Sequence, residues 1–191
     1  MSGHLVPPIL RVAALLAALA TPVLATVVER LDLPALSRAS ARVVRGMVVA
    51  RDSAWDPNGT RIVTRLTVDV VETLKGAPAA RLDVTVLGGV VGEVGQWIPG
   101  EADARTGDHA LFFLEPAGGG WRPTGMAQGV WTVSTDGQGA LWVSRGASRL
   151  ALVTPGSAPG PSARLPDRGE PPRPLDDVRA LLAAPGGGGA P

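Results

Sequence analysis

The sequence of 191 residues contains no cysteine, no tyrosine, one lysine and two histidines. Without cysteine no disulfide can form, so the fold must rest on a hydrophobic core that is stable by itself. Only His109 lies outside the first 25 residues, which leaves too few imidazoles for a His-based metal site. The scarcity of Lys and Tyr beside abundant Arg, Gly, Ala and Pro is typical of compositional bias in the coding gene.

The chain also lacks a surplus of either charge. Removal of residues 1–25 takes away one of the 18 basic side chains, Arg11, and leaves 17 against 17 acidic ones. A neutral chain has no electrostatic attraction to nucleic acid or to an anionic membrane surface. The sequence therefore predicts that neither of these is the partner.

The first 25 residues have the layout of a secretory signal peptide. Arg11 precedes the apolar run VAALLAALA, and the small residues Val23 and Ala25 precede a predicted cut. The alternative is a membrane anchor, but the run is shorter than the ~20 residues of a spanning helix, and Pro22 interrupts its end. We expect export to the periplasm or the medium, and no membrane span after cleavage.

Alternating apolar residues indicate strands over much of the chain. The even positions from Ile62 to Leu74 are mostly apolar and the odd ones polar, and shorter runs at 44–50 and 81–86 show the same pattern. Continuous apolar residues at 110–114 predict a strand that is covered on both faces. Short β-prone runs separated by Gly-rich turns continue to Val153, so the predicted fold is all-β, a small barrel or closed sandwich of five to seven strands.

Short helices are predicted on either side of this domain. Asp32 and Pro34 mark the start of one in a segment spanning 26–41, before a β domain at 42–153. Residues 154–174 are so rich in Pro and Gly that we expect an extended linker. A short amphipathic helix and a flexible tail follow at 175–191.

The order VVRGxV, VxExLKG, GG and FFL over residues 35–135 resembles netrin-like modules, tissue inhibitors of metalloproteinases and similar secreted bacterial proteins. The resemblance implies an OB-fold barrel that binds another protein. Those inhibitors chelate a protease's zinc through an N-terminal cysteine, which this chain lacks, so the predicted first residue, Thr26, is not assigned that role.

Binding residues are predicted in the loops and at one turn. Trp55 and Trp97 stand among Gly, Pro and Asx residues, where a tryptophan either caps the core or faces a partner. Asp56 and Asn58 share the first of these loops, and with Asp52 they lack the spacing of an EF-hand, so no metal is predicted. Lys75 ends the longest strand, where its ammonium either bonds carbonyl groups or remains in water.

Catalytic groups are scarce. His109 opens the apolar strand at 110–114 and follows Asp108, but adjacent strand residues point to opposite faces, which is a poor arrangement for a triad. No Gly-x-Ser-x-Gly sequence is present, and the glycines of 88–95 are not followed by Gly-Lys-Ser/Thr. We therefore expect an exported, noncatalytic binding module without a cofactor, recognising a protein or a small ligand. The alternatives are a hydrolase that uses His109 and a structural protein of the cell envelope.

Overall fold

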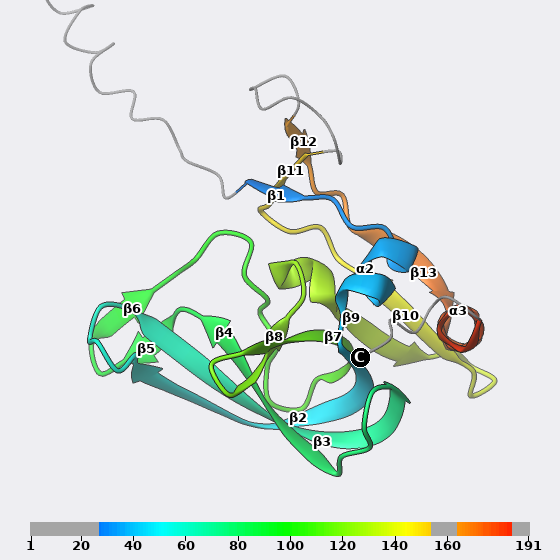
Figure 1. The fold of residues 1–191 in the computed structure, drawn as a ribbon, viewed down its shortest axis with the longest axis horizontal. Coiled ribbons are helices and arrows are strands. Elements are labelled where there is room, and N and C mark those ends of the chain that lie inside the picture. The colour runs from blue at the N-terminus through cyan, green and yellow to red at the C-terminus, as the bar shows by residue number, and fades with distance from the viewer. Residues whose placement is uncertain (1–26, 154–163, 185–191) are drawn as a thin grey trace, which may run out of the picture.

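The computed structural model describes residues 27–153 and 164–184, and the chain is mostly β (Figure 1). The predicted signal peptide, the first part of the predicted linker and the predicted tail lie outside the described residues. None of the helices in the described ranges is long and apolar enough to cross a membrane.

The elements follow one another with short connections. The helical ones are α2 (Leu33–Ala39), the 3-10 turn η1 (Met126–Gly129) and α3 (Leu175–Ala183). The strands are β1 (Val27–Glu29), β2 (Arg42–Trp55), β3 (Ile62–Lys75), β4 (Arg81–Leu87), β5 (Gly89–Val91), β6 (Val94–Gln96), β7 (His109–Ala117), β8 (Gly120–Pro123), β9 (Val130–Thr135), β10 (Leu141–Arg145), β11 (Ala151–Val153), β12 (Arg164–Pro166) and β13 (Glu170–Pro174).

The main sheet is partly closed into a ring. Its strand order is β13-β10-β9-β7-β2-β3-β4-β8, and β8 also pairs with β7, so that β7, β2, β3, β4 and β8 form a closed circuit. The contact between β4 and β8 is parallel and has a single pair, Val84 with Trp121. The seam between these two strands is therefore the weakest part of the ring.

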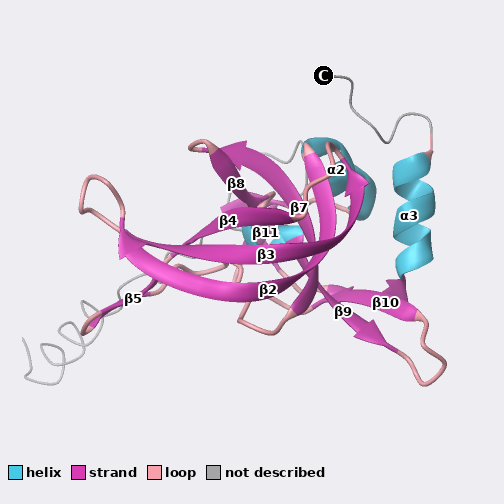
Figure 2. Cartoon of the chain, turned by 90° about the horizontal axis from the view of Figure 1, so that it is seen from below, coloured by secondary structure: helices cyan, strands magenta, loops and turns pink. Residues whose placement is uncertain are grey.

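The period-two pattern of the sequence fixes the long strands. Ile62, Thr64, Leu66 and Val68 of β3 are buried, whereas Arg65 between them is exposed. The strand pairs over its length with β2, and the two curve together along one side of the molecule (Figure 2). Three register shifts in β2 provide the bending that closing a sheet requires.

Strand β7 is covered on both faces, as its continuous apolar sequence predicts. Its residues from Ala110 to Leu114 are all buried and alternate between two hydrophobic cores. The ring core consists of Val44, Val48, Leu66, Val68, Leu82, Val84, Val86, Ala102, Ala104, Ala110, Phe112 and Leu114. The outer core consists of Leu33, Leu36, Val43, Leu111, Phe113, Trp131, Val133, Val143, Leu175 and Val178.

Both predicted helices are present, and both contribute to the outer core. Asp32 caps α2 by accepting the N–H of Ala35 at 2.8 Å, and Pro34 lies in the first turn. Helix α3 begins at Leu175, places Asp176 and Asp177 in its first turn, and packs beside β10 (Figure 2). Residues that the sequence set apart from the β domain thus complete its packing.

Two expectations about the strands need correction. The main sheet has eight strands within the described residues, not five to seven, because it extends beyond the ring through β9, β10 and β13. The segment 154–174 is not wholly a linker, since 164–166 pair with β11 and 170–174 pair with β10. Proline has no N–H to donate, but β13 is an edge strand that needs partners on one side only.

Candidate functional site

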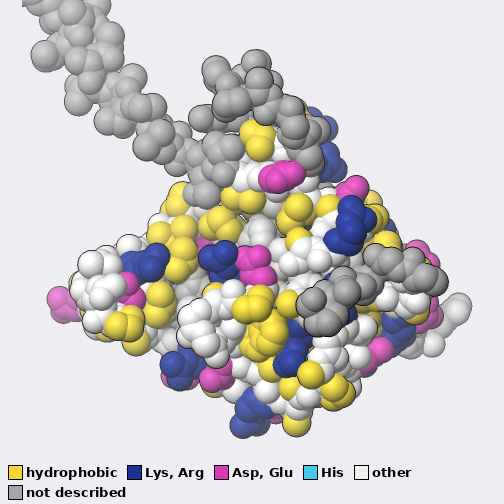
Figure 3. Space-filling view, in the orientation of Figure 1, with side chains coloured by type: hydrophobic (Ala, Val, Ile, Leu, Met, Phe, Trp, Pro, Cys, Tyr) yellow, Lys and Arg dark blue, Asp and Glu magenta, His cyan; other side chains and the backbone are white. Residues whose placement is uncertain are grey.

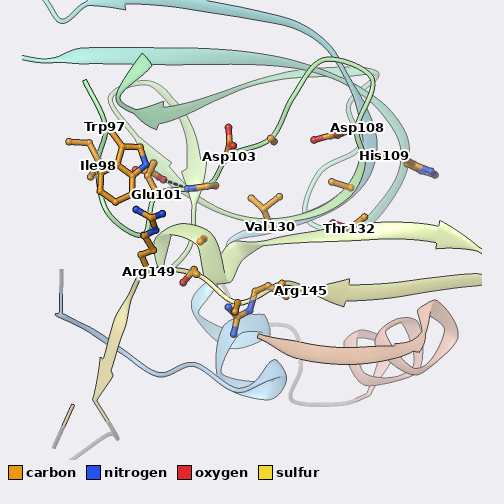
Figure 4. Close-up of a pocket in the computed structure, with 18 residues that line it drawn as sticks. Trp97, Ile98, Glu101, Asp103, Asp108, His109, Val130, Thr132, Arg145 and Arg149 are labelled. Carbon is orange, nitrogen blue, oxygen red and sulfur yellow. Dashed lines mark hydrogen bonds between the residues drawn. The ribbon is translucent and has the colours of Figure 1, made fainter. Parts of the chain in front are cut away.

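Two adjoining cavities flank the segment that follows β6, with volumes of about 470 and 430 Å³. We call them together the groove. Both are lined by five residues of this segment, which are Trp97, Ile98, Glu101, Ala102 and Asp103. Figure 4 shows the first of the two cavities. The groove therefore lies on both sides of residues 97–103.

The segment is held in place from two directions. Ala102 and Ala104 are buried in the ring core, so the chain is inserted into the molecule beside the seam. Gly100 has a φ of +80°, and a Cβ atom there would collide with the side chain of Leu150. Glycine thus allows residues 97–103 to approach the segment that carries Arg149.

Two backbone N–H groups hold the carboxylate of Glu101 in place. The N–H of Leu87 donates to Oε2 at 3.1 Å, and the N–H of Ala102 donates to Oε1 at 3.0 Å. Burial raises the pKa of Glu101 above its usual range, and these two hydrogen bonds only partly oppose that effect. Leu87 is the last residue of β4, and the short contact with β8 leaves its N–H without a strand partner. The carboxylate of Glu101 accepts this N–H instead.

Trp97 forms a platform at the entrance to the groove. Its side chain is 63% exposed, and the guanidinium carbon of Arg149 lies 4.9 Å from the ring centroid. Figure 4 shows Arg149 beneath Trp97, with Glu101 beside them. This cation–π contact restrains a ring that is largely exposed.

Other charges at the groove are already paired. Arg145 donates two hydrogen bonds to Asp167, one of them 2.9 Å long, and both side chains are almost fully buried. Arg51 lies 3.4 Å from Asp103 on the opposite side. The groove is thus polar without a large excess of either charge.

Of the five residues predicted to bind, only Trp97 lines the groove. Trp55 ends β2 rather than standing in a loop, and its side chain is 45% exposed. The carboxylate of Asp56 accepts the N–H groups of Thr60 and Arg61 at 2.7 and 3.2 Å, which lowers its pKa and organises the β2–β3 turn. Asn58 is exposed at the tip of this turn.

Lys75 lies far from the groove, at the opposite end of β3 from Ile62. Its Nζ donates to the carbonyl oxygen of Ser37, in the last turn of α2, at 2.8 Å. Burial lowers the pKa of Lys75. The one lysine therefore fastens helix α2 to the end of a strand, which is a structural role.

His109 is the first residue of β7, at the far end of the groove from Trp97 (Figure 4). Arg45 Nη1 lies 3.1 Å from its Nε2, and because a guanidinium can only donate, Nε2 is the acceptor. The carboxylate of Asp108 instead accepts the N–H of Arg105 at 2.7 Å. The imidazole thus faces a cation and lacks the orienting carboxylate of a triad.

No pattern in the sequence marks Glu101 or Arg149 as functional. Glu101 follows a Pro-Gly turn, and Arg149 lies between Ser148 and Leu150 in a segment without any recognised motif. The hydrogen bond from Leu87 to Glu101 and the contact of Arg149 with Trp97 each join residues that are well separated in the chain. In the described ranges, no group of three or more His, Cys, Asp or Glu side chains is placed to hold a metal ion.

Comparison with known proteins finds no matching family model, no matching curated protein and no matching solved structure.

Proposed function

We propose that this chain is an exported, noncatalytic binding module built on an OB-like barrel, and that its ligand site is the groove around Trp97. The sequence of residues 1–25 supports export to the periplasm or the medium. The likeness to netrin-like modules remains a prediction from sequence.

The order of strands supports the OB-like interpretation. Around the ring the spatial order is β2, β3, β4, β8, β7, and β7 pairs with β2. In chain order these are the first, second, third, fifth and fourth of the ring strands. A five-stranded, partly open barrel with Greek-key connections is the OB design, and its ligands bind on the barrel face and on the loops beside it.

The observation that carries the proposal is the exposed platform of Trp97 between two cavities. Each volume lies in the ~300–1,000 Å³ range of ligand sites, and tryptophan is among the residues that dominate binding free energies. No packing in the core requires a ring that is 63% exposed and stacked on an arginine. Binding explains its position better than folding does.

The groove offers little for catalysis. A catalytic base must accept a proton, yet the Nε2 lone pair of His109 is directed at Arg45. Glu101 has a raised pKa, but both of its oxygens accept backbone N–H groups. Of the two hydroxyl side chains that line the groove, Ser148 and Thr132, the first already donates its proton to Asp167. The hydrolase alternative therefore has no observation in its favour.

The test is affinity capture with the full chain, tagged at its C terminus, from the envelope and secreted fractions of the producing organism. Proteins and small molecules that are retained are identified by mass spectrometry. We expect a species that is lost with Trp97→Ala but kept with Trp55→Ala, which removes an exposed tryptophan outside the groove. Retention that is the same for the parent and both variants, or no specific retention, would contradict the proposal.

A further inference from the structure

The surroundings of Trp97 restrict the chemistry of a ligand, provided that the groove is the binding site proposed above. One face of the indole is covered by the guanidinium of Arg149. A cationic ligand on the same ring would be repelled by that guanidinium. The opposite face suits an uncharged surface with C–H groups, which packs well on an aromatic ring.

Glu101 offers hydrogen-bond acceptors beside this ring. Each carboxylate oxygen has about two acceptor positions, and the N–H groups of Leu87 and Ala102 use one on each oxygen. The remaining positions are fixed in direction because two backbone donors hold the carboxylate. A ligand that brings hydroxyl donors would satisfy them and stabilise the ionised form.

The charges along the groove point to a neutral ligand. Three acidic and three arginine side chains line the two cavities, namely Glu101, Asp103, Asp108, Arg51, Arg145 and Arg149. The surface seen in Figure 3 likewise mixes both signs without a large field of either. A nucleic-acid strand needs a cationic surplus, which the groove does not provide.

Addition of a peptide strand at the end of β4 is also disfavoured. Peptides that bind by strand addition need free backbone groups at a sheet edge. The N–H of Leu87, at the end of β4 beside the groove, is already bonded to Glu101. Two compartments that share one aromatic platform instead suit a chain of repeated rigid rings with many hydroxyl groups.

We propose that the groove binds a neutral oligosaccharide, with one pyranose ring stacked on the face of Trp97 opposite Arg149 and hydroxyl groups donating to Glu101. The two cavities, one on each side of residues 97–103, take successive sugar units. The carboxylate selects the hydroxyl pattern, and the platform supplies most of the affinity.

The experiment is calorimetric titration of the purified chain at pH 7 with tetrasaccharides of glucose in α-1,4 and β-1,4 linkage, of β-1,4 N-acetylglucosamine and of α-linked mannose. The matching monosaccharides, a tetragalacturonate, a thymidine oligonucleotide and a basic peptide are titrated as probes of other ligand classes. We expect at least one neutral tetrasaccharide to bind, and to bind more tightly than its monosaccharide.

The variants assign the binding to the groove. Trp97→Ala should weaken it at least about tenfold, and Trp55→Ala should leave it within about twofold. Because a hydroxyl donor stabilises ionised Glu101, affinity should rise with pH through the pKa of Glu101, and Glu101→Gln should abolish that dependence. The unfolding midpoint of each variant shows that it is folded.

Three results would overturn the inference: no neutral tetrasaccharide binds, binding is unaffected by Trp97→Ala, or the charged probes bind more tightly. The proposed function can survive the first and third of these results. If affinity capture still yields a species lost with Trp97→Ala while every neutral sugar fails, the groove is a binding site for another ligand class.

Discussion

Lys75 shows how one side chain connects two elements. The last carbonyl groups of a helix have no partner within it and carry the negative end of the helix dipole, so an ammonium group is well suited to bond one of them. The bond from Nζ to Ser37 is 2.8 Å long. It links α2, and through α2 the outer core, to the end of the ring strand β3.

We predict that Lys75→Met lowers the free energy of unfolding by about 1 kcal/mol, because methionine retains the packing of the stem but leaves the Ser37 carbonyl unpaired. Lys75→Arg, which keeps a donor, should lose less. Urea denaturation at pH 7 measures both. A methionine variant as stable as the parent would mean that the ammonium contributes nothing to the fold.

His109 allows a test of pH dependence, since it is the one imidazole outside residues 1–25. Burial, and then the charge of Arg45, lower the pKa of His109 below its ordinary 6.5. Between the folded and unfolded pKa values, unfolded chains bind a proton that folded chains do not. The free energy of unfolding therefore rises with pH across this window and falls as the pH drops.

We predict that the parent loses stability between pH 7.5 and pH 5.5 with a slope of at most about 1.4 kcal/mol per pH unit from this group. His109→Gln, whose amide oxygen can still accept from Arg45, should lose less. Denaturation of both proteins across this range gives the difference. The raised pKa of Glu101 makes stability fall as the pH rises, but this contribution is the same in both proteins and cancels in their difference. If the unfolding free energies of the two proteins changed equally with pH, His109 would not be the source of the pH dependence.

At the scale of elements, the sequence predicts what depends on local periodicity. The alternation in β3, the apolar run of β7, the capped start of α2 and the acidic first turn of α3 are all present. These patterns can be identified without knowing the partner strand, because the order of apolar and polar residues alone indicates whether one face or both are buried.

The elements that sequence missed depend on distant contacts. Strand β13 contains three prolines and pairs only because β10 offers it an edge. The ring closes through one pair of β4 and β8, which no local pattern marks. The groove likewise depends on Trp97 meeting Arg149, and nothing in either segment indicates the other.

The C-terminal segment, residues 164–184, is attached by a buried ion pair. Burial alone would raise the pKa of Asp167, but hydrogen bonds from Arg145, Ser148 and the N–H of Gly169 outweigh it and hold the pKa below its usual range. Deleting this segment would leave Arg145 buried without a partner and would remove Leu175 from the outer core. Deletion is therefore a poor test of an envelope-anchoring role.

We predict that Asp167→Asn lowers the free energy of unfolding by about 3 kcal/mol, because it leaves the Arg145 charge buried and uncompensated. The same substitution at exposed Asp52 should change it by less than about 0.5 kcal/mol. Chemical denaturation compares the two variants. Equal, small losses would show that the ion pair does not fasten the segment.

For the whole molecule, the question is whether two hydrophobic cores make two folding units. Strands β2 and β7 contribute alternate residues to both cores, such as Phe112 to the ring core and Phe113 to the outer core. Neither core can lose its packing without exposing one face of a strand that the other core needs. The geometry therefore implies one cooperative unit, with helix α3 included.

We predict that Val84→Ala in the ring core and Val178→Ala in the outer core each cost about 2 kcal/mol and lower the same transition. Both side chains are fully buried. Far-ultraviolet circular dichroism follows the loss of the sheet. Tryptophan fluorescence includes the signal of Trp131, which lies in the outer core. The two signals should give one midpoint in every variant, because shared strands transmit the loss of either core to the other. If Val178→Ala shifted the fluorescence midpoint and left the dichroism midpoint unchanged, the outer core would unfold separately, and β7 would not couple the two halves.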